Sequence, residues 1–316
     1  MEDPLSQFLS LVEARAVIST GLAARGLWAM HVPPVRALKC NMIKRGECTV
    51  ETRGKRWRLT AGDCFLIGPE LPFVIGTDLN RLPRHAAEVF AGPRESSYAQ
   101  LNAGAGPDFL CLSGRMDLTE TARFLTDTLP PMIVVRSDSP VAGRLHWLVG
   151  RLEDELSSKA PGSTAMARQI MQMIFIELLR NLPEERTGSW LAALSDPRIG
   201  AALRAIHDAP RRVWRLDELA GISHLSRSRF SARFRAAVGR APMDYVLRWR
   251  MTLAQKALLQ PDATIATIAA QFGYGSESAF IHAFRQATGL TPRQARQEAR
   301  SKATDLPAGL DFPANR

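Results

Sequence analysis

The sequence predicts an α+β protein, with an N-terminal β-barrel flanked by helices and a C-terminal all-α domain in which a two-helix unit occurs twice. Three observations predict this fold. Short β-like runs, broken by Gly, Pro and charged pairs, occupy residues 16–75. A ten-residue pattern at 230–239 recurs in altered form at 280–289. The net charge of +10 is concentrated in the part of the chain that holds this repeat.

A chain of 316 residues is long enough for two domains, each with its own core. We expect the barrel and its helices over residues 1–182 and the all-α domain over residues 195–300. A linker is expected between them at 183–194. The tail at 301–316 has Pro, Gly and Asp but no periodicity, which predicts disorder.

The predicted barrel strands are short apolar or alternating runs bounded by turn residues, as in a small sandwich or barrel. They cover residues 38–43, 48–52, 57–60, 64–67, 109–112 and 132–135. Residues 94–107 are polar and Gly-rich, which predicts a mobile loop. Helical spacing predicts short helices at 5–12 and 118–129.

Residues 59–69, Leu-Thr-Ala-Gly-Asp-Cys-Phe-Leu-Ile-Gly-Pro, resemble the cupin pattern of a strand, a Gly-Asp turn and a second strand leading to a proline. Enzymatic cupins place two histidines and a glutamate on such strands. The glutamates near these positions have no neighbouring histidine, and the nearest histidines are isolated in sequence. These residues are Glu47, Glu51, Glu70, His31 and His85. We therefore expect no metal and no cofactor, and a barrel that holds an unidentified small-molecule effector.

Two amphipathic helices are predicted at about 141–156 and 163–182. The second is apolar around much of its circumference, more than one neighbouring element would bury. Exposed apolar surface of this kind usually marks an interface, which predicts a homodimer. Packing of the same surface against the barrel is the alternative.

In each copy of the repeat, two phenylalanines four positions apart mark one buried helix face, and a glycine closes the helix. A short helix, at 216–222 or 265–272, precedes each copy across a tight turn. Two short helices joined in this way form a helix-turn-helix. The motifs span about 217–238 and 265–288, a helix at 245–259 joins them, and Ser226 is expected to cap the second helix of the first motif.

The basic charge coincides with these motifs. Residues 195–300 hold 17 Lys and Arg against 8 Asp and Glu, a net charge of +9, and the rest of the chain holds 24 against 23. A charge run alone is usually a solvated face. Combined with a tandem helix-turn-helix, it indicates an electrostatic footprint for double-stranded DNA.

The two motifs, their joining helix and Gly-Leu-Thr-Pro-Arg at 289–293 resemble an AraC/XylS-type transcriptional regulator, and the N-terminal half resembles the cupin-type sensor of one subgroup. The resemblance implies a sequence-specific DNA-binding regulator rather than an enzyme, with RNA polymerase as a further candidate partner. His224 stands where the family usually has a turn glycine, whereas Gly273 keeps it. The first motif is therefore expected to be strained or to use a different turn.

The family's base-contacting positions fall on five residues of the second helices, and helix geometry adds two outward residues. These residues are Ser228, Ser231, Ala232, Ser278 and His282, with Glu277 and Ile281 added. Four arginines are expected to meet phosphates, which set affinity and register. They are Arg227, Arg229, Arg235 and Arg285. The two helices suit successive major grooves, about 34 Å apart.

Two other function classes stay open: a cupin enzyme with an accessory DNA-binding domain, and an architectural protein that bends DNA. The chain has no signal-peptide pattern and no apolar run of about 18 residues, so we expect a cytoplasmic protein with reduced thiols. The four cysteines lack zinc spacing. They are expected to be buried hydrophobes, and the alternative is a thiol sensor that pairs Cys48 with Cys64.

Overall fold

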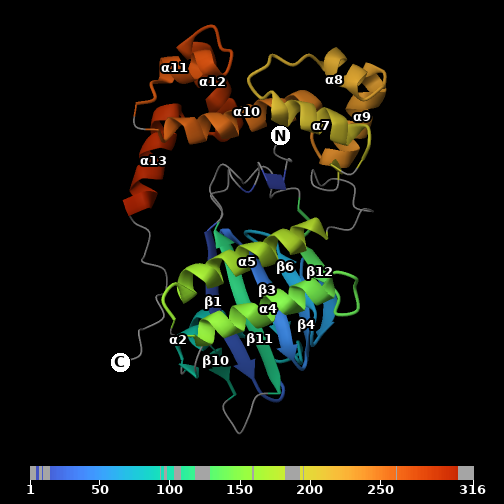
Figure 1. The fold of residues 1–316 in the computed structure, drawn as a ribbon, viewed down its shortest axis with the longest axis vertical. Helices are drawn as coiled ribbons and strands as arrows, with labels where there is room; N and C mark the ends of the chain where they lie inside the picture. Colours follow the sequence, from blue (N-terminus) through green and yellow to red (C-terminus); the bar gives the residue numbers. More distant parts are fainter. Residues whose placement is uncertain are drawn as a thin grey trace. The chain divides into compact units, whose positions relative to one another are not determined.

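The computed structural model describes most of the chain (Figure 1). The described residues are 5–6, 9, 15–92, 94–95, 98–102, 108–117, 129–158, 160–181, 193–194, 196–260 and 262–304. They form two compact units, one of sheets and helices between residues 15 and 181 and one all-helical from residue 193 onward. The helices predicted at 5–12 and 118–129 and the linker predicted at 183–194 lie wholly or mostly outside the described residues.

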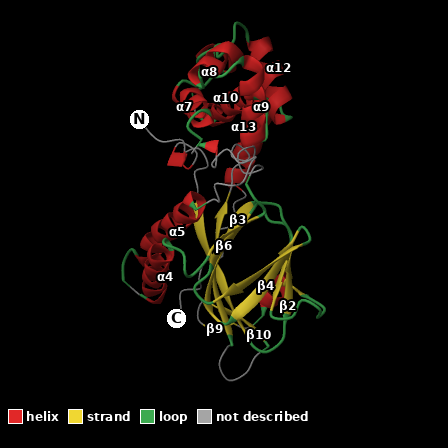
Figure 2. Ribbon diagram, turned by 90° about the vertical axis from the view of Figure 1, so that its right-hand side faces the viewer, coloured by secondary structure: helices red, strands yellow, loops and turns green. Residues whose placement is uncertain are grey.

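The first unit contains two β-sheets. In the described residues, the larger sheet has the order β12 (Met132–Val135), β6 (Cys64–Ile67), β3 (Ala37–Arg45), β11 (Phe109–Asp117), β1 (Arg15–Ala24), β10 (Tyr98–Leu101), β9 (Arg94–Glu95). The smaller sheet has the order β5 (Lys55–Thr60), β4 (Glu47–Thr52), β7 (Phe73–Gly76), β2 (Ala29–Val32), β8 (Arg84–His85). Figure 2 shows the two sheets facing each other. Buried apolar side chains from both sheets form one shared core. This arrangement confirms the predicted β-rich region.

All six predicted strands are present, but the mobile loop predicted at 94–107 is wrong for its described part. Strand β10 lies within that range and pairs in parallel with β1, with Gly21 opposite Tyr98. Ala99 and Leu101 of β10 are buried in the core between the sheets. The sequence around these four residues is polar and Gly-rich, so the local pattern predicted a loop. The strand forms because two of its side chains are buried in the core.

Helices α4 (Ala142–Ser157) and α5 (Ser163–Arg180) cover the other face of the larger sheet (Figures 1 and 2). The side chain of Met171 lies against Gly114 of β11, where a Cβ atom would overlap the thioether. The Nζ atom of Lys44 lies 2.7 Å from Glu153 Oε2 and connects α4 to β3. The barrel therefore buries most of the apolar surface of α5, which is the alternative that the sequence left open. A shorter helix, α2 (Ala86–Ala91), follows β8.

The second unit is all-helical, as predicted. Its helices are α7 (Ile199–Asp208), α8 (Leu216–Ile222), α9 (Arg227–Val238), α10 (Pro242–Leu258), α11 (Ile265–Gln271), α12 (Glu277–Thr288) and α13 (Pro292–Thr304). Helix α13 continues four residues beyond Arg300, into the segment predicted to be a disordered tail.

Helix α10 belongs to two cores at once. Near its beginning, Tyr245 packs edge-on against Phe234 of α9, with ring centroids 5.7 Å apart. Near its end, Met251 and Leu258 join Phe284 of α12 in a second apolar cluster. The two helix-turn-helix units are thus held by opposite halves of one helix, with α9 and α12 toward its two ends (Figure 1).

Candidate DNA-binding interface

Both helix-turn-helix units make the same turn. The N–H of Leu225 donates to the carbonyl oxygen of Ala220 at 3.0 Å, and Tyr274 N–H donates to Ala269 at 2.9 Å. These are the six-residue closures of a helix end that needs one residue in the left-handed region. His224 fills that position with φ of 52°, where the second unit has Gly273 with φ of 77°. The first unit therefore keeps the glycine-type turn, and His224 carries its backbone strain.

The second helices of the two units, α9 and α12, have different N-terminal caps. Ser276 accepts a hydrogen bond from Ala279 N–H at 3.2 Å, which is an ordinary side-chain cap. Ser226 occupies the corresponding N-cap position before α9, as predicted. Its hydroxyl accepts no hydrogen bond from the helix, so the predicted side-chain cap is wrong. Instead, Arg227 Nε lies 2.8 Å from Asp217 Oδ1 and links the start of α9 to α8.

The outward face of α9 holds the residues predicted from the sequence. Phe230, Phe234 and Val238 are buried, as predicted from their spacing. The opposite side exposes the predicted contact residues, apart from Ser231, which is half-buried. The exposed residues are Ser228, Ala232, Arg227, Arg229 and Arg235. This face offers hydroxyls, a methyl group and cations, which suit base edges and phosphates in a major groove.

Helix α12 repeats the arrangement with different chemistry. Phe280 and Phe284 are buried, and Ile281 is half-buried at the edge of the outward face. The remaining predicted contact residues are exposed, namely Glu277, Ser278, His282 and Arg285. A carboxylate, an imidazole and a guanidinium on one face can read base edges through both donors and acceptors.

Only some of the basic residues behind the +9 charge are available to DNA. Arg250 Nη2 donates to the Arg212 carbonyl oxygen at 2.7 Å, and Arg296 Nε donates to Leu258 at 3.0 Å. Arg233 Nη2 lies 2.8 Å from Asp196 Oδ2. Within the described part of the chain, Arg229, Arg235 and Arg285 make no ion pair. The net charge of the sequence does not distinguish the arginines without an ion pair from those that stabilise the fold through hydrogen bonds and ion pairs.

The glutamates at the expected cupin metal positions each face an arginine. Arg58 Nη2 lies 2.7 Å from Glu47 Oε2, and Arg56 and Arg36 similarly pair with Glu51 and Glu70. Among the described residues, no group of three or more His, Cys, Asp and Glu is placed to hold a metal ion.

The two histidines described as isolated in sequence are brought together by the fold. His31 of β2 lies opposite His85 of β8, with ring centroids 5.8 Å apart. The Nδ1 atom of His85 accepts the Ala87 N–H at 3.2 Å, which caps α2. The pairing is a consequence of two parallel strands, which local sequence patterns do not reveal.

All four cysteines are buried, and burial raises the pKa of each thiol. Cys64 lies opposite Met42 on β3, and Cys111 lies opposite the next residue, Ile43. Since neighbouring strand residues point to opposite faces, Cys64 and Cys111 lie on different faces of the larger sheet. Cys48 belongs to the core between the sheets with Cys111. The Cys48–Cys64 pair considered for a thiol sensor is therefore separated by the sheet.

Comparison with known proteins agrees with both units. Residues 3–184 match the cupin family model, and residues 219–298 match a helix-turn-helix domain model. The chain is 35% identical over 297 residues to an AraC-like transcription regulator of Streptomyces lividans, covering 92% of this chain and 96% of that one. It is 34% identical over 297 residues to an AraC-like regulator of Streptomyces antibioticus, covering 92% and 97%.

Among solved structures, the DNA-binding domain of AdpA in complex with a target DNA is 24% identical, with a TM-score of 0.32, covering 34% of this chain and 97% of that one. The described helices include none that is long and apolar enough to cross a membrane. Both of these similar proteins are described as transcription regulators, which favours a regulator over the cupin-enzyme alternative. The chain belongs to the AraC family of DNA-binding transcriptional regulators, with an N-terminal cupin domain and a C-terminal helix-turn-helix domain.

Proposed function

We propose that this regulator reads one face of its operator with α9 and α12 in two successive major grooves. The main observation that supports this proposal is that both helices bury their paired phenylalanines and turn their predicted contact residues outward. Ser228, Ser231 and Ala232 read bases from α9, and Glu277, Ser278, Ile281 and His282 read them from α12. Arg227, Arg229, Arg235 and Arg285 hold phosphates. Sequence-specific regulation, rather than indiscriminate DNA bending, follows from this division of contacts.

Salt titration tests the phosphate contacts. Each phosphate neutralised adds about 0.9 to the slope of log affinity against log salt. Arg229, Arg235 and Arg285, which make no ion pair with other described residues, therefore contribute about 2.7. Arg229→Ala, Arg235→Ala and Arg285→Ala are each expected to lower the slope by about 0.9 and to weaken all sequences equally. Lys55→Ala, in the cupin domain, is the matched control. Unchanged slopes in all three variants would contradict the phosphate assignment.

Operator selection tests the base contacts. His282→Ala and Ser228→Ala are expected to change which base is preferred at one position of the selected site. Their salt slopes are expected to stay at the wild-type value, because neither removes a cation. A uniform loss of affinity with the same selected sequence would reject the base-reading role.

We further propose that a small-molecule effector binds in the cupin domain and controls DNA binding. The support is the two-sheet fold of the cupin domain, in which the inner faces of both sheets enclose one core. The mouths of β-barrels are common ligand sites in proteins. Genomic binding profiles collected with and without candidate molecules test this proposal, and an unchanged profile across an effector library would contradict it.

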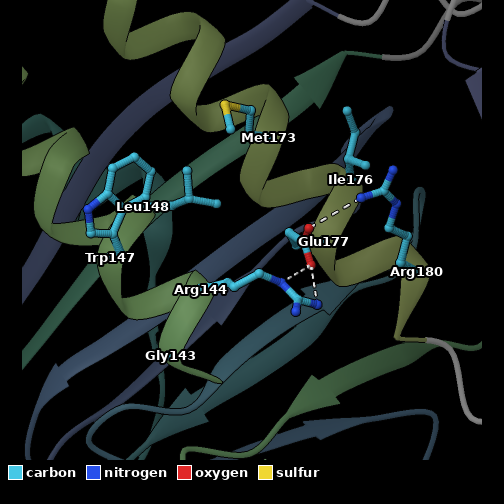
Figure 3. A pocket seen from close by; sticks show the side chains of 8 residues that line it. All are labelled: Gly143, Arg144, Trp147, Leu148, Met173, Ile176, Glu177 and Arg180. Atoms are coloured by element: carbon cyan, nitrogen blue, oxygen red, sulfur yellow. Dashed lines mark hydrogen bonds and ion pairs between the residues drawn. The ribbon is translucent and has the colours of Figure 1, made fainter. Parts of the chain in front are cut away.

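We also propose that a second copy of the chain docks on the outer face of α4 and α5. There a groove of about 430 Å³ lies between Trp147 and Met173, which are 65% and 48% exposed (Figure 3). At its rim Glu177 accepts hydrogen bonds from Arg144 and Arg180. An exposed tryptophan beside an apolar groove is typical of an interface centre, and the paired charges form a polar rim.

Sedimentation of the full chain tests this surface. Trp147→Arg and Met173→Arg are expected to convert a dimer to a monomer at micromolar concentration. Leu82→Arg changes a side chain that is 93% exposed elsewhere in the cupin domain and serves as the control. A monomeric wild type, with and without DNA, would remove this proposal.

A further inference from the structure

One end of the core between the sheets is polar. On β3 the side chains of Lys39, Asn41 and Ile43 alternate onto the same face, and Ile43 belongs to the apolar core. On the neighbouring strand β11, Cys111 is opposite Ile43, Ser113 is opposite Asn41, and Arg115 is opposite Lys39. The face that is apolar at Ile43 therefore becomes polar and basic two residues further along.

The middle row of this region is buried but not fully hydrogen-bonded. Asn41 and Ser113 are only 6% and 7% exposed, and Ser113 Oγ donates to Asn41 Oδ1 at 2.8 Å. The Nδ2 atom of Asn41 is buried and has no hydrogen-bond partner among the described residues. A buried amide donor without a partner is unfavourable, so a polar ligand atom that accepts its hydrogen bond would remove that penalty.

The outer row carries an excess of positive charge. Lys39 and Arg115 are half-buried neighbours. The pKa of Lys39 is lowered, mainly by burial and to a lesser extent by the nearby charge of Arg115. Arg115 Nε lies 2.9 Å from Asp117 Oδ1, but at an angle that makes no hydrogen bond. Two cations and one carboxylate leave one positive charge among these described side chains, which matches a monoanion.

We propose that Lys39, Asn41, Ser113 and Arg115 form an anion site that holds the carboxylate of an organic effector. This inference rests on the proposed effector control and specifies its ligand class. Lys39 and Arg115 supply charge, and the free N–H groups of Asn41 donate to a carboxylate oxygen. Ile67 and Phe65 of β6, opposite Lys39 and Asn41, are apolar and fully buried, so the body of the effector is apolar.

The alternative to a ligand site is a purely structural polar cluster. A structural cluster would be more stable with both of its cations present. A ligand site instead keeps unfavourable charges in its empty form, because binding uses them. Lys39→Met is therefore expected to raise the melting temperature of the ligand-free protein by a few degrees. A fall in melting temperature in a folded variant would favour the structural cluster.

The binding test uses the full chain and matched pairs of probes: acetate, benzoate and octanoate, each beside its neutral amide. At least one carboxylate is expected to bind, measured by calorimetry and by its upward shift of the melting temperature. Its amide is expected to bind at least about tenfold more weakly, as are Lys39→Met and Arg115→Met with the carboxylate. Lys39→Arg retains the charge and is expected to restore binding, and Lys55→Met, exposed on β5, is the control.

The outcomes separate this inference from the broader proposal. Equal binding of a carboxylate and its amide, unaffected by Lys39→Met, would overturn the anion site and leave effector binding in the cupin domain intact. Failure of every carboxylate to bind would also overturn the anion site. Effector control itself would fail only if no molecule, neutral or charged, changed the genomic binding profile.

Discussion

The imidazole Nε2 of His207 in α7 lies 2.7 Å from the hydroxyl oxygen of Tyr245 in α10, in the core that supports the first helix-turn-helix unit. The imidazole also stacks on Trp249, with ring centroids 3.9 Å apart. Burial lowers the pKa of His207 to about 3 and raises the pKa of Tyr245. The histidine is therefore a neutral core residue that connects α7 to α10 through ring contacts and a hydrogen bond.

This relationship predicts a loss of stability in acid. Below the unfolded-state pKa of about 6.5, the unfolded chain takes up a proton at His207 and the folded chain does not. The free energy of unfolding is then expected to fall by about 1.4 kcal/mol per pH unit, down to the folded pKa of about 3. Urea melts of wild type and His207→Phe between pH 7 and 4 measure the difference in slope. Parallel slopes would show that His207 is not the titrating group.

The shared turn predicts opposite effects for two matched substitutions. His224→Gly is expected to stabilise the first unit by about 1 kcal/mol, because glycine adopts φ of 52° without strain. Gly273→Ala is expected to destabilise the second unit by a similar amount. A Cβ at Gly273 would meet its nearest neighbour, the Arg211 oxygen, at an ordinary 3.5 Å, so the cost comes from φ alone. Thermal melts check both, and destabilisation by His224→Gly would contradict the strain.

The buried phenylalanines predict local unfolding. Phe234→Ala and Phe284→Ala each remove a fully buried ring, which typically costs about 3–5 kcal/mol. Each is expected to abolish protection from hydrogen exchange in its own unit and to remove specific DNA binding. Arg235→Ala, one position from Phe234 but exposed, is the control and is expected to keep the wild-type melting temperature. Wild-type exchange in both phenylalanine variants would reject the assigned inward face.

The buried cysteines predict insensitivity to mild oxidation. Burial raises the pKa of Cys64 and Cys111 to about 12, which leaves almost no thiolate at neutral pH. Operator binding by reduced and peroxide-treated protein is expected to coincide, as is binding by Cys48→Ser and Cys64→Ser. An oxidation-dependent change that is lost in either variant would restore the thiol-sensor hypothesis.

The sequence predicted the elements that depend on local pattern. The paired phenylalanines placed α9 and α12 and their outward faces correctly, because helical spacing alone decides which side is buried. Strand β10 was missed because its burial depends on pairing with the distant strand β1. The pairing of His31 with His85 was missed for the same reason.

The hydrogen-bond partners of long side chains could not be predicted from local sequence patterns either. Arg250 and Arg296 count as charge in the sequence, yet they donate to backbone carbonyls across about 40 residues of chain. The polar row at Lys39 and Asn41 needs the register between β3 and β11 before it appears as one site. Such contacts are set by tertiary structure, which a single sequence does not display.

If α9 and α12 bind the operator as proposed, helix α10 sets the distance and the angle between them. Its 17 residues span about 25 Å, and opposite halves are fixed in the cores of the two units. Inserting one residue in its middle would advance the second unit by about 1.5 Å and rotate it by about 100°. The reading face of α12 would then point away from the DNA that α9 contacts. In the proposed complex, changes in the exposed side chains would alter the operator sequence, whereas the spacing between the two contacted grooves would be fixed by the length of α10.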